Sequence, residues 1–204
     1  MSNIKQYLGP LSKDNPILVQ TLGVCSALAV TAQLKPAVVM ALSVTVVCAC
    51  SNLIISLIRN TIPSRIRIIV QRLVVSFFVI MVDLLLQSYL YDVIKLLSVF
   101  VGLIITNCII MGRLEAFALS HKPLPSLMDG VMNGLGYGLV LVVVAFFREL
   151  LGSGTLWNHQ VVPDSWYAAG YLNNGLMILP PMALILIGVI IWAKGPRVEG
   201  QGPK

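Results

Sequence analysis

Six apolar stretches constrain this chain more than any other feature of its sequence. They cover residues 17–32, 37–58, 73–90, 97–112, 131–151 and 175–193. Each approaches the roughly 20 residues that a helix needs to cross a bilayer. The composition agrees, because 57% of the 204 residues are hydrophobic and only 11% are charged, whereas soluble domains carry about 25% charged residues. We therefore expect an all-α integral membrane protein with six transmembrane helices, in one transmembrane domain covering residues 1–204.

The net charge of +6 would suggest a nucleic-acid partner in a soluble protein. In a membrane protein, basic residues instead set orientation, since they collect on the cytoplasmic side. With six crossings, Lys35, Lys95 and Arg148 lie on one side of the membrane. The other eleven of the fourteen basic residues share a side with both termini: Lys5, Lys13, Arg59, Arg65, Arg67, Arg72, Arg113, Lys122, Lys194, Arg197 and Lys204. We expect cytoplasmic termini, lipid as the surroundings and no nucleic-acid partner.

The first and fourth apolar stretches are short, at about 16 residues each, and polar or glycine residues interrupt them just before Cys25 and Cys108. They open two halves of three spans, approximately residues 15–92 and 93–194. Because three is odd, the second half enters the membrane upside down. We therefore predict a 3+3 inverted-topology repeat with broken first and fourth helices, in which the functional site lies near the midplane.

Cys25 and Cys108 both fall near the middle of the predicted membrane. Thiolate sulfur suits iron–sulfur clusters, zinc or copper(I). A [2Fe–2S] cluster needs four protein ligands, so a second, similar chain would supply the other two. Cys48 and Cys50 are two residues apart and point to different helix faces, which favours packing or lipid contact. From the residues alone, a redox subunit and a secondary ion transporter are equally supported, with a structural scaffold as a third hypothesis.

The stretches 22–31 and 102–118, which surround the two cysteines, carry a resemblance to a known family. Further similar stretches are 56–60, 89–92, 129–138 and 147–154. Together they closely resemble the D subunits of bacterial Na+-translocating NADH:quinone oxidoreductases, which belong to the Nqr/Rnf family of membrane subunits. The homologous subunit of the Rnf complex, a ferredoxin:NAD+ oxidoreductase, is the near alternative.

The resemblance implies a membrane electron-transfer subunit in the bacterial inner membrane. The D and E subunits of the six-subunit complex are related proteins in opposite orientations, and each supplies two cysteines to a shared intramembrane [2Fe–2S] cluster. The matching residues here are Cys25 and Cys108. The resemblance further implies that FMN, FAD, riboflavin and a second [2Fe–2S] cluster lie on other subunits. No NADH or quinone site is evident on this chain.

Two acidic residues carry a weaker hypothesis, that of a Na+ pathway. Asp83 lies within an apolar stretch, where a carboxylate is costly and often functional. Asp129 precedes the fifth stretch, and its first interpretation is a cap at the start of a helix. Nearby glycines four residues apart predict a close helix contact, at Gly130, Gly134 and Gly138. Pro180-Pro181 predicts a kink or an unwound turn in the sixth stretch.

Overall fold

The computed structural model describes residues 17, 21–60, 62–63, 65–89, 102–156, 159–160 and 175–194. These residues are helical apart from the turns between helices and one antiparallel pair of two-residue strands, β1 (Thr155–Leu156) and β2 (His159–Gln160). Residues 102–105 are also helical. The remaining elements, in chain order, are α2 (Val24–Val30), α3 (Leu34–Ile58), α4 (Arg67–Tyr89), α6 (Cys108–Arg113), the π-helix η1 (Leu114–Ala118), α7 (Pro123–Gly152), the 3-10 helix η2 (Gly175–Ile178) and α9 (Pro180–Lys194).

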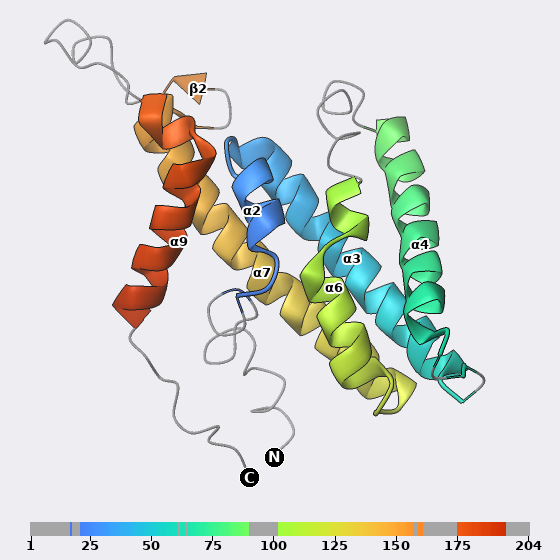
Figure 1. Ribbon diagram of the computed structural model, residues 1–204. Helices are drawn as coiled ribbons and strands as arrows, with labels where there is room; N and C mark the ends of the chain where they lie inside the picture. Colours follow the sequence, from blue (N-terminus) through green and yellow to red (C-terminus); the bar gives the residue numbers. More distant parts are fainter. Residues whose placement is uncertain are drawn as a thin grey trace, which may run out of the picture.

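The helices α3 and α7 pack against each other along the centre of the molecule (Figure 1). They contain 25 and 30 residues, which correspond to about 37 and 45 Å of helix. Both exceed the hydrocarbon core of a bilayer, about 30 Å thick. The pair is antiparallel, because Glu149 of α7 accepts a hydrogen bond from the backbone N–H of Leu34, while Ser56 near the end of α3 donates to the carbonyl of His121.

Glycines on α7 allow the backbones of this pair to approach closely. A Cβ atom added to Gly134 would lie 2.7 Å from the Cα atom of Thr45, and one added to Gly130 would lie 2.9 Å from the Cα atom of Ala49. At Gly138 the added atom would lie 2.9 Å from a side chain of α3. These distances are too short for any residue with a side chain. The predicted small-residue helix contact is confirmed, and its partner is α3 of the same chain.

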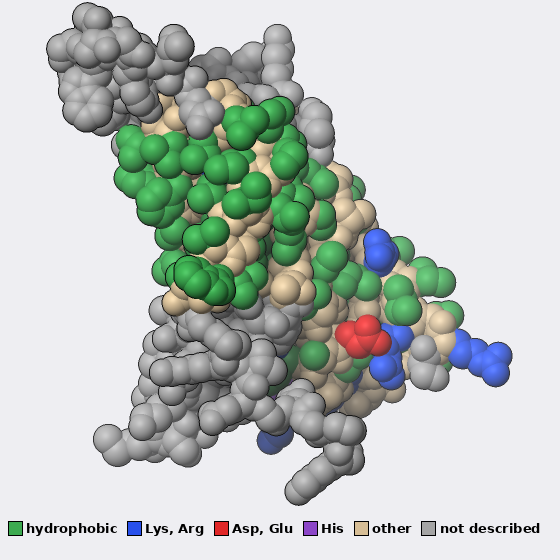
Figure 2. Space-filling view, turned by 60° about the vertical axis from the view of Figure 1, so that its left-hand side comes forward, with side chains coloured by type: hydrophobic (Ala, Val, Ile, Leu, Met, Phe, Trp, Pro, Cys, Tyr) green, Lys and Arg blue, Asp and Glu red, His purple; other side chains and the backbone are tan. Residues whose placement is uncertain are grey.

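The helices α4 and α9 flank this central pair on opposite sides, with α2 and α6 between them (Figure 1). Val75 and Val79 of α4 are buried, whereas most of its large hydrophobic residues, among them Leu73 and Phe77, are exposed. Figure 2 shows hydrophobic side chains covering the α9 side of the molecule, while charged side chains gather toward one end. An apolar exterior of this kind is suited to lipid or to partner membrane helices.

Three helices are long and apolar enough to cross a membrane, within the described residues: α3, α4 up to Ser88, and α7. The shorter apolar helix is 180–193. The prediction of a helical membrane protein with several spans is therefore confirmed. The finer prediction, of six spans in a 3+3 repeat, stays a prediction. Residues 18–20 of the first stretch and 97–101 of the fourth lie outside the described residues.

Two boundaries are informative. The sixth stretch divides into η2 and α9 at Pro180, which confirms the predicted interruption, since proline lacks the N–H that a continuous helix requires. Helix α7 begins at Pro123 rather than near residue 131, because proline is well tolerated at the first helical position. Asp129 therefore lies inside α7, and the interpretation of Asp129 as a helix cap was wrong.

Candidate metal centre

The segment before α2 turns sharply and places Cys25 in the first turn of that helix. Gly23 has a φ angle of +79°, and Thr21 also has a positive φ, of 52°. Glycine adopts this left-handed conformation without steric cost. The hydroxyl of Ser26 donates a hydrogen bond of 2.9 Å to the carbonyl of Gly23, so a side chain next to the cysteine satisfies a carbonyl at the turn.

The second interruption lies directly before Cys108. The helical turn at residues 102–105 ends at Thr106, and Asn107 adopts an extended conformation with φ −67° and ψ 120°. The side-chain oxygen of Asn107 then accepts a hydrogen bond of 3.1 Å from the backbone N–H of Ile109. This is an ordinary N-cap contact, and it starts α6 at Cys108. Each cysteine thus lies at the start of a helix, beside a hydrogen-bonded turn.

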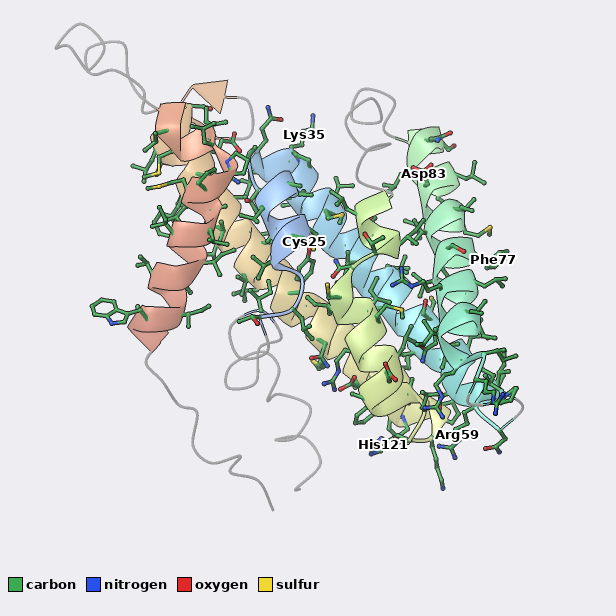
Figure 3. All side chains as sticks on the ribbon, in the orientation of Figure 1. Cys25, Lys35, Arg59, Phe77, Asp83 and His121 are labelled. Carbon is green, nitrogen blue, oxygen red and sulfur yellow. The ribbon has the colours of Figure 1, made fainter. Side chains whose placement is uncertain are left out.

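The two interrupted segments are in direct contact. A Cβ atom on Gly23 would lie 2.7 Å from the Cδ1 atom of Ile109, and the side-chain amide of Asn107 donates a 3.3 Å hydrogen bond to Ser26 Oγ. Since Ser26 follows Cys25 and Asn107 precedes Cys108, the cysteine-bearing turns meet. Both cysteines are exposed on this chain, and Cys25 lies between the two ends of the molecule (Figure 3).

Tyr137 of α7 joins the same contact. Its hydroxyl oxygen lies 2.7 Å from Ser26 Oγ, and the Asn107 amide nitrogen lies 3.5 Å from it. All three residues have no exposed surface. We call Ser26, Asn107 and Tyr137 the junction cluster. Sequence reasoning missed it, although two of its members are neighbours of the cysteines, because nothing in the local pattern relates Tyr137 to either one.

The other candidate ligands lie elsewhere. Cys48 is buried in the core and Cys50 is half-buried, so Cys48 packs within the protein. The ring of His121 stacks on Phe117 with 3.9 Å between ring centroids. Among the described residues, no three His, Cys, Asp or Glu side chains lie close enough together to hold a metal ion. Within that part of the chain, Cys25 and Cys108 are therefore not joined by a third ligand of these kinds.

The two acidic candidates are far apart. Both carboxylate oxygens of Asp129 accept hydrogen bonds from the guanidinium of Arg113, and Asn133 donates a further bond of 3.0 Å. Asp83 accepts a 3.1 Å hydrogen bond from Gln87. Figure 3 places Asp83 toward the end of the molecule opposite His121, the residue that lies just before α7. The structure does not bring the two carboxylates together.

Arg148 has a structural role that sequence reasoning did not foresee. It was expected to be a charge on the outer side of the membrane, but only 1% of its surface is exposed. Its guanidinium donates to Thr31 Oγ1 at 2.5 Å, to the carbonyl of Met177 at 3.1 Å and to that of Ile178 at 2.6 Å. The hydroxyl of Thr31 follows α2, and the two carbonyls lie at the end of η2, where helix carbonyls lack partners. The guanidinium bonds to all three, so Arg148 ties both segments to α7.

The fold and the site define a helical membrane protein with several spans, in which the turns that begin α2 and α6 meet beside a pair of cysteines. The chain belongs to the Rnf-Nqr family, since residues 3–191 match the family described as "Rnf-Nqr subunit, membrane protein". It is 53% identical to the D subunit of the Na(+)-translocating NADH-quinone reductase of Shewanella woodyi, over 98% of this chain and 97% of that protein. Identity is 54%, with the same coverage, to the corresponding D subunits of Shewanella putrefaciens and Shewanella sp. strain W3-18-1. The resemblance to D subunits is confirmed.

Proposed function

We propose that this chain is the D subunit of a Na+-translocating NADH-quinone reductase, in which Cys25 and Cys108 supply two of the four ligands of an intramembrane [2Fe–2S] cluster. The homologous E subunit supplies the other two. The contact between the two cysteine-bearing turns carries this proposal. The Ser26–Asn107 hydrogen bond links the neighbours of both cysteines across 81 positions of sequence. The names of the Shewanella relatives support the assignment to the complex.

The residues present fit half of such a centre. Thiolates are the ligands that iron–sulfur clusters use, and the exposure of both cysteines leaves them accessible to a neighbouring chain. A bound cluster would supply one-electron transfer across the membrane. The chain's own contribution is to hold the turns at Gly23 and Asn107 against each other and to leave both cysteines exposed.

Reciprocal contacts support the inverted repeat with halves 15–92 and 93–194. Arg148, on the long helix of the second half, donates to Thr31 in the turn that precedes α3. Arg59, which follows the long helix of the first half, donates at 2.8 Å to the carbonyl of His121 in the turn that precedes α7. In each half, an arginine at the end of the long helix bonds to the turn before the long helix of the other half. Such paired contacts are expected when a pseudo-two-fold axis in the membrane plane relates the halves.

The distribution of charge supports the expected orientation. Arg59 and His121 lie at one end of the molecule, and Lys35 and Asp83 lie toward the other (Figure 3). By the positive-inside rule, we infer that the Arg59 end faces the cytoplasm, and we retain the prediction of cytoplasmic termini in the bacterial inner membrane. We assign FMN, FAD, riboflavin, a second [2Fe–2S] cluster and NADH oxidation to the other members of a six-subunit complex.

For Na+ movement, Asp83 is the better candidate, because Arg113 already occupies the carboxylate of Asp129. We expect Asp83→Asn to weaken the Na+ dependence of quinone reduction in the purified complex, with all subunits retained. Unchanged Na+ dependence would remove Asp83 from the pathway. The matched change Glu115→Gln removes an exposed carboxylate from η1 and controls for the loss of surface charge.

The decisive test concerns the metal. Iron, acid-labile sulfide and the low-temperature EPR spectrum are measured for the purified complex, for Cys25→Ser and for Cys108→Ser, with Cys48→Ser as the matched control. Loss of one [2Fe–2S] signal in the first two variants, with every subunit present, supports the proposal. A full signal in Cys25→Ser would overturn it, and a secondary ion transporter would then be the better interpretation.

A further inference from the structure

The protons of the junction cluster can be assigned from its geometry. A serine hydroxyl carries one proton, and the Ser26 hydroxyl donates it to the carbonyl of Gly23 at 2.9 Å. In the 2.7 Å contact between Ser26 and Tyr137, the donor must therefore be the Tyr137 hydroxyl. The amide of Asn107 donates toward both oxygen atoms. The result is a directed set of bonds in which Ser26 Oγ accepts from two different helical segments.

In this arrangement, Tyr137 is the residue that joins the two cysteine-bearing turns to α7. Asn107 and Ser26 contact each other across a distance of 3.3 Å, at the long end of ordinary hydrogen bonds. The stronger bond is the one that Tyr137 makes to Ser26. The Tyr137 ring also lies beside the turn, since a Cβ atom on Gly23 would be 3.2 Å from its Cε2 atom. Tyr137 has no exposed surface, so bulk water does not reach its hydroxyl.

We propose that Tyr137 is a positioning residue, whose buried hydroxyl sets the separation of Cys25 and Cys108 through Ser26 and Asn107. Tyr137 acts through Ser26 and Asn107 and does not itself bind the metal. Its hydroxyl fixes the two cysteine-bearing turns relative to α7, the longest helix of the described residues. The expected effect on the cluster's potential rests on the proposed function. The effect on the separation of the two thiols does not, because it concerns this chain alone.

The test therefore uses two readouts on the membrane-embedded complex. The first is the midpoint potential and EPR line shape of the [2Fe–2S] signal that the cysteine variants identify. The second is the rate at which a short bifunctional maleimide joins Cys25 to Cys108 in cluster-depleted membranes, in a Cys48→Ala, Cys50→Ala background. Tyr137→Phe removes only the hydroxyl. Ser43→Ala is the matched control, because Ser43 is also buried but, among the described residues, its hydroxyl bonds to Val39 of its own helix alone.

We expect Tyr137→Phe to change the cross-linking rate and the reduction equilibrium constant by about threefold to tenfold, as for the loss of one buried hydrogen bond. A tenfold change in that constant is about 59 mV for a one-electron couple. Ser43→Ala should leave both readouts at wild-type values. Wild-type values of both readouts in Tyr137→Phe would overturn the inference.

Two further outcomes are also decisive. If the cysteine variants keep the full iron–sulfur signal while Tyr137→Phe alters cross-linking, the proposed cluster is wrong and the positioning role stands. If Tyr137→Phe does not assemble, Ser26→Ala removes the acceptor of the Tyr137 hydroxyl and keeps the ring. The same changes in both readouts are then expected, and wild-type values in Ser26→Ala would again overturn the inference.

Discussion

Gly23 shows at the scale of one residue why the cysteine-bearing turn depends on its sequence. Its positive φ of +79° and the 2.7 Å separation between an added Cβ atom and Ile109 Cδ1 leave no room for a side chain. In Gly23→Ala, the left-handed conformation costs about 1–2 kcal/mol, and Ile109 beside Cys108 must also move. We expect less [2Fe–2S] signal per assembled complex, measured as iron and EPR intensity.

The control for this change is Gly188→Ala in α9, where an added Cβ meets nothing within 4 Å. Alanine there should be neutral or slightly favourable, since glycine is a poor helix former. Equal iron content in Gly23→Ala and Gly188→Ala would show that the turn tolerates a side chain and that its contact with Ile109 is unimportant.

The sequence is informative about residues whose chemistry is local. Cys25 and Cys108 could be selected because each follows an interruption in an apolar stretch. The hydrogen bond between Ser26 and Tyr137 spans 111 positions, and only the tertiary fold brings these residues together. The burial of Arg148 was unforeseen for a similar reason. Two of its acceptors are backbone carbonyls of a distant segment, and no residue pattern marks a carbonyl as unsatisfied.

At the scale of elements, the contact between α3 and α7 holds the fold together. An added Cβ at Gly134 would lie 2.7 Å from the Cα atom of Thr45, and backbone atoms cannot move aside as a flexible side chain can. We expect Gly134→Val to separate the two helices and to lower the thermal unfolding temperature of the purified complex. Leu135→Ala on the exposed face of α7 is the control. If both variants unfolded at the wild-type temperature, the close approach of these helices would not contribute to stability.

Arg148 secures two other elements, because its guanidinium bonds to the residue after α2 and to carbonyls of η2. Hydrogen bonds to a charged group contribute about 1.5–3 kcal/mol each, and Met has similar bulk without donors. We expect Arg148→Met to destabilise the chain by about 3 kcal/mol or more, measured as loss of assembled complex in detergent. Arg148→Lys should recover part of this loss, since an ammonium can satisfy some of the same carbonyls. No difference between Met and Lys would indicate that packing, rather than hydrogen bonding, is the role of Arg148.

At the scale of the whole molecule, hydropathy predicted the helical membrane class and the proline pair predicted the interruption at Pro180, but the hydropathy profile placed the start of α7 too late. Residues 123–130 are too polar to register as an apolar stretch. They are nevertheless helical, because α3 and Arg113 satisfy their polar groups: Asn52 donates to the carbonyl of Ser126, and Arg113 pairs with Asp129. Tertiary contacts of this kind extend a helix beyond its apolar segment, and a hydropathy profile does not detect them.

The orientation of the molecule yields a final prediction. Lys35 and Arg59 lie near opposite ends of the 25-residue helix α3 (Figure 3), so they should face opposite sides of the membrane. In a background without Cys48 and Cys50, Lys35→Cys should react with a membrane-impermeant maleimide added to intact cells, and Arg59→Cys should react only in inverted vesicles. Detergent should expose both positions, which controls for intrinsic reactivity. Labelling of Arg59→Cys from outside intact cells would reverse the assignment of the basic end to the cytoplasm. Labelling of both positions from one side would instead show that α3 does not cross the bilayer.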